Sequence, residues 1–501
     1  MKGNMYLENM FNSFLGGVED EKMIFIRYFS MINLDEKKIN EMAKEKRIDK
    51  VIFHRYERGD MKSPFEPFID VIGELYRKFY SGLFSLEAFL KECGVYPLQV
   101  SAFASYIETG EAKRKEPAIP EEQTYEPAKA YESIINCLNY VASRHKVVIV
   151  LDKFQYANLS TIRVISKILD SVGDVKFKMF IAFNDKNRIK AYASEEFQDL
   201  IRIANEKKMV YEWHGYEVEG GEAAVGYFRP EFEHFHEYAV KVKNLYTLMA
   251  LEDAEYYLNM IYVRIEEDKV NVDVVDKFEL YSIGASNYLL MNNPKSALLI
   301  AEKLCYFEGT KERIIRRYVY NHLCALSYIF LLQNNNAEEY IENCKKISEE
   351  ADDDDMRFYA MLLEITSEYG AWHSIFNVNF EKLKYDEEKA KRLEERGFYN
   401  VLARYYSYGS DNTEEEILNI IEKGMSEPFK KAIAIGERLN NNNFLLSVNT
   451  KYISRFTDLG YYDYASNFYE EKLKILNREG NKRRMANQML GLGYNSMIAE
   501  E

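Results

Sequence analysis

The sequence has few cysteines and no long apolar run, and these two absences argue against a disulfide-bonded, zinc-binding or membrane-spanning protein. The five cysteines among 501 residues are odd in number and scattered, with no C-x-x-C pair, so neither a disulfide framework nor a zinc site is supported. No apolar run approaches the roughly 20 residues that a membrane-spanning helix needs, and the N-terminus has no apolar core of signal-peptide length. We therefore expect a cytoplasmic protein with no membrane partner and no bound metal.

Positive charge is also in short supply. Lys and Arg number 66 against 81 Asp and Glu, which gives a net charge of −15 at pH 7. Duplex DNA and anionic membranes both demand a basic face, so this balance argues against nucleic acid as the main partner. The signature motifs of serine, zinc and thiol hydrolases are missing too, which leaves those reaction classes without support.

Proline is rare, whereas aromatic residues are abundant. Nine prolines stand against 40 tyrosines and 30 phenylalanines. Many aromatic side chains with few helix breakers suit stacked helices whose large side chains fill the seams between them. A compositional habit of the source organism would give the same balance, so the organisation has to be derived along the chain.

Residues 1–220 have the pattern of an α/β domain. Short β-branched or aromatic runs alternate there with helical patterns. Residues 108–127, rich in charge and with three prolines, are expected to form an exposed loop or linker, and residues 221–275 a helical connector. The strand candidates are residues 23–29, 50–56, 146–151, 175–183 and 209–213.

Residues 276–501 are predicted to be helical throughout and to contain an internal repeat. Small residues, Asn- or Gly-bearing turns and early alanines recur in the same order, with Ala297 and Ala337 as matching anchors. The segment Gly460 to Ala465 resembles a tetratricopeptide repeat, which implies an all-α solenoid. A non-repetitive helical bundle is the alternative. Residues 485–496 look like the first helix of another unit, which either caps the solenoid or continues in a longer protein.

One segment, residues 147–163, resembles a nucleotide motif. A buried strand ends in Asp152 and turns into an amphipathic helix, and in nucleotide-hydrolysing α/β domains the Mg²⁺-organising acid lies at such a strand end. The segment resembles the second nucleotide motif of the STAND class of AAA-related signalling ATPases, including maltose-activator-type regulators. That motif runs from a hydrophobic strand through Leu-Asp-Asp-Leu-Gln-Trp-Ala-Asp into a Ser-Leu-Arg helix start. The matching residues are Leu151, Asp152, Gln155, Ala157 and Thr161 to Arg163, with Tyr156 for Trp and Asn158 for Asp.

The resemblance covers roughly residues 20–215 and implies an α/β P-loop-like domain. Residues 63–69 match its Pro-aromatic-x-Pro-Phe segment, and Asn184 follows a strand like the polar sensor residue that would face the γ-phosphate. Helical repeats are also how this class usually continues. In an intact member, the resemblance implies bound Mg-ATP and a signalling role.

Two departures predict that the nucleotide site is degenerate. The first strand is followed by residues 30–39 without any glycine, although the phosphate-binding loop must bend with positive φ. Asp35 and Glu36 stand near the places of the last glycine and the lysine. Lys153 replaces the second acid, and lysine is no base for the attacking water at neutral pH.

We therefore expect no enzyme and no cofactor, but a pseudo-ATPase domain in a non-catalytic regulatory or scaffold protein. The alternative is a signalling switch or transcription regulator that holds Mg-ATP through Asp152, Asn184 and a displaced Lys37. No basic helix-turn-helix at either end supports a transcription regulator.

The solenoid is the expected binding element. Its concave face would capture a protein, peptide or small effector, and the α/β domain would serve as a packing platform or a homo-oligomer surface. The residues expected on the solenoid face from the repeat period are Asn287, Asn321, Tyr328, Tyr452 and Arg455.

Overall fold

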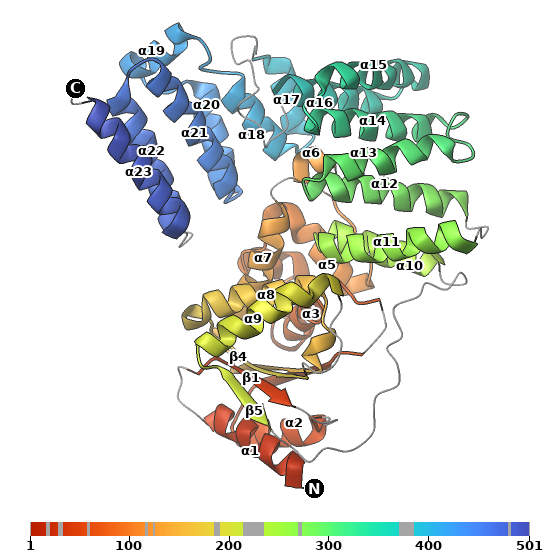
Figure 1. Ribbon diagram of the computed structural model, residues 1–501, viewed down its shortest axis with the longest axis vertical. Helices are drawn as coiled ribbons and strands as arrows, with labels where there is room; N and C mark the ends of the chain where they lie inside the picture. The colour runs from red at the N-terminus through yellow and green to blue at the C-terminus, as the bar shows by residue number, and fades with distance from the viewer. Residues whose placement is uncertain are drawn as a thin grey trace. The chain divides into compact units, whose positions relative to one another are not determined.

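The chain divides into two compact units in the computed structural model. The first comprises Met1–Lys115 and Glu126–Asn287, and the second comprises Glu116–Tyr125 and Tyr288–Glu501 (Figure 1). The residues that the structure describes are 2–16, 21–28, 34–57, 61–115, 119–123, 126–184, 191–213, 235–268, 273–369, 385–478 and 482–499.

The first unit is built on a parallel sheet. Its strands lie in the order β2-β3-β4-β1-β5, and each paired neighbour runs in the same direction. Parallel alignment brings the carboxyl ends of all strands to one edge. Every residue of β3 is buried, as expected for a strand covered on both faces. The strand bounds are β1 Met23–Tyr28, β2 Lys50–Arg55, β3 Val147–Asp152, β4 Lys178–Phe183 and β5 Val210–Trp213, which confirms all five strand candidates with small shifts at their ends.

Helices cover both faces of this sheet. One face, with Ile24, Ile26, Val150 and Phe180, packs against α1 and α2, whereas α3, α7, α8 and α9 lie on the other side (Figure 1). The helix bounds are α1 Lys2–Gly16, α2 Glu36–Glu45, α3 Phe68–Phe79, α4 Leu86–Glu92, α5 Val100–Thr109, α7 Glu126–Ala142, α8 Leu159–Asp170, α9 Ser194–Glu206, α10 Phe235–Thr247 and α11 Leu251–Asp268.

The boundary between the units differs from the predicted one. Residues 221–275 were expected to form a connector, but α10 and α11 belong to the first unit, and the division falls inside α12, Val274–Leu290. The reason is a set of long-range polar contacts from α11 to α8, described below, which the helical pattern alone does not reveal.

The second unit is all-helical. Alanines at the predicted anchors, Ala297, Ala337 and Ala465, are fully buried and let paired helices approach closely, and Gly460 has the left-handed φ of +80° that a helix end requires. An α/β domain followed by helical repeats is therefore confirmed as the fold class. Its helices are α6 Pro120–Gln123, α13 Pro294–Lys303, α14 Ile314–Phe330, α15 Asn334–Ala351, α16 Asp354–Tyr369, α17 Glu387–Glu395, α18 Tyr399–Tyr408, α19 Glu414–Lys423, α20 Glu427–Arg438, α21 Asn442–Asp458, α22 Tyr462–Arg478 and α23 Lys482–Ala499.

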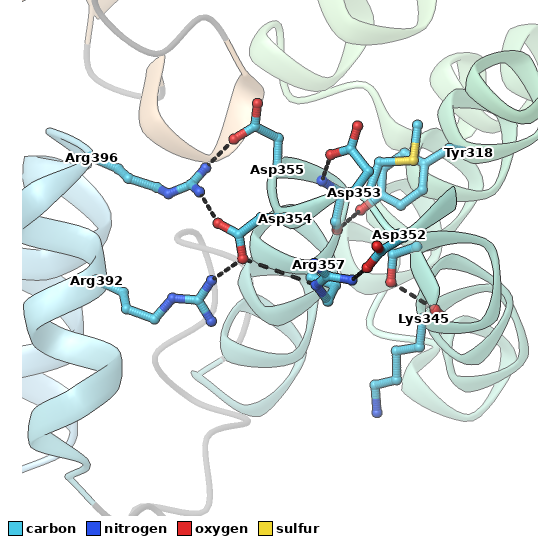
Figure 2. A network of polar contacts seen from close by, with 11 residues as sticks. Tyr318, Lys345, Asp352, Asp353, Asp354, Asp355, Arg357, Arg392 and Arg396 are labelled. Atoms are coloured by element: carbon cyan, nitrogen blue, oxygen red, sulfur yellow. Dashed lines mark hydrogen bonds and ion pairs between the residues drawn. The ribbon is translucent and has the colours of Figure 1, made fainter. Parts of the chain in front are cut away.

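An acidic turn ties α17 to α16 in this unit. Asp353 accepts the Met356 N–H at the start of α16, where negative charge also complements the helix dipole. Arg392 of α17 and Arg396, the residue directly after this helix, form ion pairs with the neighbouring carboxylates, Asp354 among them (Figure 2). These ion pairs are exposed, so each contributes little alone and the network mainly fixes the orientation of the two helices.

The segment predicted as an exposed linker is partly buried. Within residues 108–127, Glu121, Glu122 and Gln123 have no exposed surface and form α6, which belongs to the second unit. The prediction of exposure is wrong for these residues. Charge and proline content indicate the absence of a long regular element, but they do not exclude a short buried turn whose main chain and Glu122 side chain are hydrogen-bonded to another helix.

Candidate functional site

Asp152 lies at the carboxyl end of β3 with no exposed surface. The register of β2 and β3 places Arg55 directly opposite it. The Arg55 Nε donates a hydrogen bond of 2.7 Å to Asp152 Oδ2, and Nη2 donates one of 2.5 Å to the Leu34 carbonyl. The guanidinium therefore joins three segments at this edge of the sheet.

The Asp152 carboxylate has further donors. Its Oδ1 accepts the Lys153 N–H at 3.0 Å, and the Leu34 N–H also donates to it. Burial raises the pKa of Asp152 above its ordinary value, and the hydrogen bond and charge of Arg55 offset this only in part. A charge held in such surroundings depends on its cationic partner.

The start of α2 is closed by a carboxylate of the chain itself. Asp35 Oδ1 accepts the backbone N–H groups of Lys37 and Lys38 at 3.0 and 3.3 Å. In phosphate-binding folds such amides at a helix N-terminus hold the anion. The Lys37 side chain is exposed. Residues 30–33, the first part of the predicted glycine-free turn, lie outside the described residues.

Asn184 lies beside this edge, at the end of β4. It is buried, and its backbone N–H donates a 3.0 Å hydrogen bond to Gln155 Oε1 in the turn after β3. Lys153, at the place of the second acid, has a left-handed backbone with φ of 56°. Asp152, Asn184 and the start of α2 thus share one edge, as the sequence indicates, whereas Arg55 was missed.

A buried acid from α11 caps the helix that follows Asp152. Asp253, fully buried, accepts the Leu159 N–H at 3.1 Å, the Tyr192 hydroxyl at 2.9 Å, and the Ser160 hydroxyl. Arg163 on the same helix pairs with Glu252. Sequence reasoning missed Asp253 because an acid in the first turn of its own helix is ordinary.

Three residues predicted on the solenoid face are buried, so that prediction is wrong for them. Asn287 donates to the Leu251 carbonyl at 3.0 Å, Asn321 to the Arg317 carbonyl at 2.8 Å, and the Tyr452 hydroxyl to Asp411 at 2.7 Å. The repeat period identifies residues that share a helix face, but it does not tell which face the next helix covers.

The other two predicted face residues are half-buried and lie apart. Tyr328 on α14 stacks on Tyr340 with ring centroids 5.6 Å apart. Arg455 on α21 donates to the Asn412 carbonyl. No described contact brings these two side chains together with the three buried ones into one site.

A buried lysine also escaped prediction. Lys451, 1% exposed, donates from Nζ to the Ser407 and Ser410 carbonyls at 2.6 and 2.7 Å. Burial lowers the pKa of Lys451 to about 7, against the opposing charge of Asp411. The cluster holds the turn after α18 against α21.

Comparisons with known proteins give no family for the chain. No protein-family model matches it, and no curated protein is similar to it. Among solved structures, a Signal Transduction ATPase with Numerous Domains (STAND) protein with a tetratricopeptide repeat sensor from Pyrococcus horikoshii is similar. The TM-score is 0.42 and the identity 11%, over 96% of this chain and 84% of that one.

The helices of the described residues were compared with the length and hydropathy that a membrane span requires. None of these helices is long and apolar enough to cross a bilayer.

Proposed function

We propose that this chain is a non-catalytic regulatory or scaffold protein, in which the α/β unit is a pseudo-ATPase and the helical unit binds a protein or peptide. The observation that carries the proposal is the pair between Arg55 and Asp152. A Mg-nucleotide site uses such a carboxylate for its cation. Here the carboxylate is neutralised by a guanidinium of the same chain.

The neighbouring groups support the same conclusion. The Asp35 carboxylate already accepts two backbone N–H groups at the start of α2, and in a phosphate-binding fold such amides hold the anion. Lys153 stands where a second acid would polarise water. The described residues therefore do not fit a Mg-nucleotide, and we derive no reaction step through one.

The contact between Arg55 and Asp152 also opposes cation binding. A cation at Asp152 has to displace Arg55 and break its hydrogen bond to the carboxylate, and a hydrogen bond to a charged group contributes roughly 1.5–3 kcal/mol. The Arg55 side chain is 29% exposed, so the displaced guanidinium is partly rehydrated and the cost lies near the lower bound, about 1.5 kcal/mol. That is a loss of roughly tenfold in affinity.

Calorimetric titration with Mg-ATP tests the proposal. We expect no saturable heat at millimolar nucleotide, and no change in the Asp152→Ala variant. The control is Asp170→Ala, which removes an exposed acid at the end of α8. Micromolar binding that Asp152→Ala abolishes and Asp170→Ala retains would favour the alternative, an ATP-dependent signalling switch or transcription regulator.

A further inference from the structure

The short helix α6 lies in the second unit as a bound peptide would. Residues 119–123 are flanked on both sides by chain of the first unit, yet they belong to the second unit, where α6 contacts α18 (Figure 1). Ile119 packs against the core of that unit, and Glu121, Glu122 and Gln123 are fully buried. Three consecutive polar residues are buried this completely only where partners satisfy them.

Glu122 is held at the start of α18. Its two carboxylate oxygens accept the backbone N–H groups of Asn400 and Val401 at 2.8 and 3.0 Å. The Asn400 side chain donates to the Glu122 carbonyl at 2.9 Å, and Asn441 donates to Asn400 Oδ1 at 2.9 Å. Asn441 thereby orients the Asn400 amide, so that the site recognises both the side chain and the main chain of this glutamate.

Glu121 contacts side chains of two helices, α18 and α14. Arg404 donates to the Glu121 carbonyl at 2.9 Å and to the Asn400 carbonyl at 3.4 Å. His322 Nε2 lies 3.2 Å from Glu121 Oε1. Arg404 and His322 are themselves buried. The acceptor side thus places helix amides against the Glu122 carboxylate, His322 against the Glu121 carboxylate, and Arg404 against the Glu121 main-chain carbonyl.

The ends of this segment are fastened within the first unit. Arg114 forms a two-bond ion pair with Glu126, with hydrogen bonds of 2.6 and 2.7 Å, and both side chains are buried. Arg114 also donates to the Leu98 carbonyl at 2.6 Å, and Gln99 to the Glu126 carbonyl at 3.0 Å. The two positions that flank α6, Arg114 and Glu126, are therefore held together.

We propose that α14 and α18 form an acceptor site for acidic peptides that carry a Glu-Glu pair, filled in this state by residues 119–123 of the chain itself. A protein partner presenting such a segment binds by displacing α6. This deepens the proposed function, because it rests on the binding role of the helical unit and names the chemistry of its ligand.

Because residues 119–123 are part of the same chain as the acceptor site, they compete strongly with a peptide added in solution. A segment joined at both ends by a short loop has an effective concentration in the millimolar range, so a free peptide of equal intrinsic affinity competes poorly. Weakening the internal segment should therefore raise the apparent affinity for a peptide added in trans.

The test uses the full chain and a fluorescent peptide with the sequence of residues 116–125. We expect little binding to the wild type by fluorescence anisotropy, and at least roughly tenfold tighter binding to the Glu122→Ala chain. Adding Arg404→Met to that chain should remove the gain. A control peptide with Gln in place of the second glutamate should bind worse than the native peptide.

A Glu122→Ala chain that folds with a wild-type circular dichroism spectrum but does not bind the peptide would overturn the acceptor site. Binding unchanged by Arg404→Met would do the same. If Glu122→Ala does not fold, Glu122→Gln keeps the side-chain volume and replaces it in every arm. Either failure leaves the Mg-ATP titration unaffected, so the pseudo-ATPase proposal is judged separately.

Discussion

At the scale of single residues, the ion pair between Arg55 and Asp152 is expected to contribute to the free energy of unfolding. Arg55→Met should lower the free energy of unfolding by roughly 3 kcal/mol, because it leaves the Asp152 carboxylate buried without its cation. Denaturant unfolding of the full chain measures this loss. The control, Arg202→Met, removes an exposed arginine from α9 and should cost less than about 1 kcal/mol.

A double variant distinguishes charge from packing at this pair. Arg55→Met with Asp152→Leu removes both charges and should recover most of the stability lost by Arg55→Met alone. Equal losses in the single and the double variant would mean that the ion pair does not hold this edge.

Lys451 gives a pH dependence whose sign follows from its lowered pKa. The unfolded chain binds a proton on this lysine up to about pH 10.5, whereas the folded chain releases it near pH 7. The unfolded state therefore holds more protons between these values, so stability rises with pH there, by at most about 1.4 kcal/mol per pH unit.

Urea unfolding at pH 7, 8 and 9 checks this dependence. The stability of the wild type relative to Lys451→Met should increase over this range, while Lys430→Met, at an exposed lysine, should run parallel to the wild type. Asp411, Glu416 and Arg455 also act on Lys451, and the first two raise its pKa. Parallel curves for Lys451→Met would show that the lysine stays charged when folded.

The sequence predicts the position of Asp152 but not its partner. A strand that ends in an acid is a local pattern, readable within a few residues. Arg55 meets Asp152 across 97 positions of chain, through a strand register that no local pattern specifies. The burial of Lys451 has the same origin, since a lysine on a helix ordinarily lies at the surface.

At the scale of elements, a buried acid of α11, Asp253, caps the start of α8. Asp253→Ala should lower stability by roughly 1–3 kcal/mol, because the Leu159 N–H and two hydroxyl groups lose a buried acceptor. Hydrogen exchange should quicken at the amides of Leu159 and Ser160. Glu195→Ala, an exposed first-turn acid of α9, is the control, and equal effects of the two variants would contradict the capping role.

Strands and repeat helices were predictable for a shared reason. Because one face of each element is buried, apolar residues recur with the period of a strand or a helix. The five strands and the alanine anchors can therefore be recognised within short windows of sequence. The α6 turn has no such period. Its burial depends on amides and an arginine of α18 that lie about 280 positions further along the chain.

At the scale of the whole molecule, the second unit is built from two separate stretches of chain, Glu116–Tyr125 and Tyr288–Glu501. The first stretch includes α6, whose Glu122 accepts hydrogen bonds from α18. Glu122→Ala should therefore weaken the second unit by roughly 1–3 kcal/mol, since two buried N–H groups lose their acceptor. Hydrogen exchange at Asn400 and Val401 measures the effect. Glu111→Ala, at an exposed acid, should leave these amides unchanged, and protection that survives Glu122→Ala would contradict the contact.

The measurement that tests the account most directly is phosphate release from Mg-ATP by the full chain. The proposal of a pseudo-ATPase predicts the same background rate for the wild type and for Asp152→Asn, which keeps the shape of the side chain but removes its charge. A wild-type rate clearly above that of Asp152→Asn would show that Arg55 yields to a metal and that the α/β unit hydrolyses nucleotide.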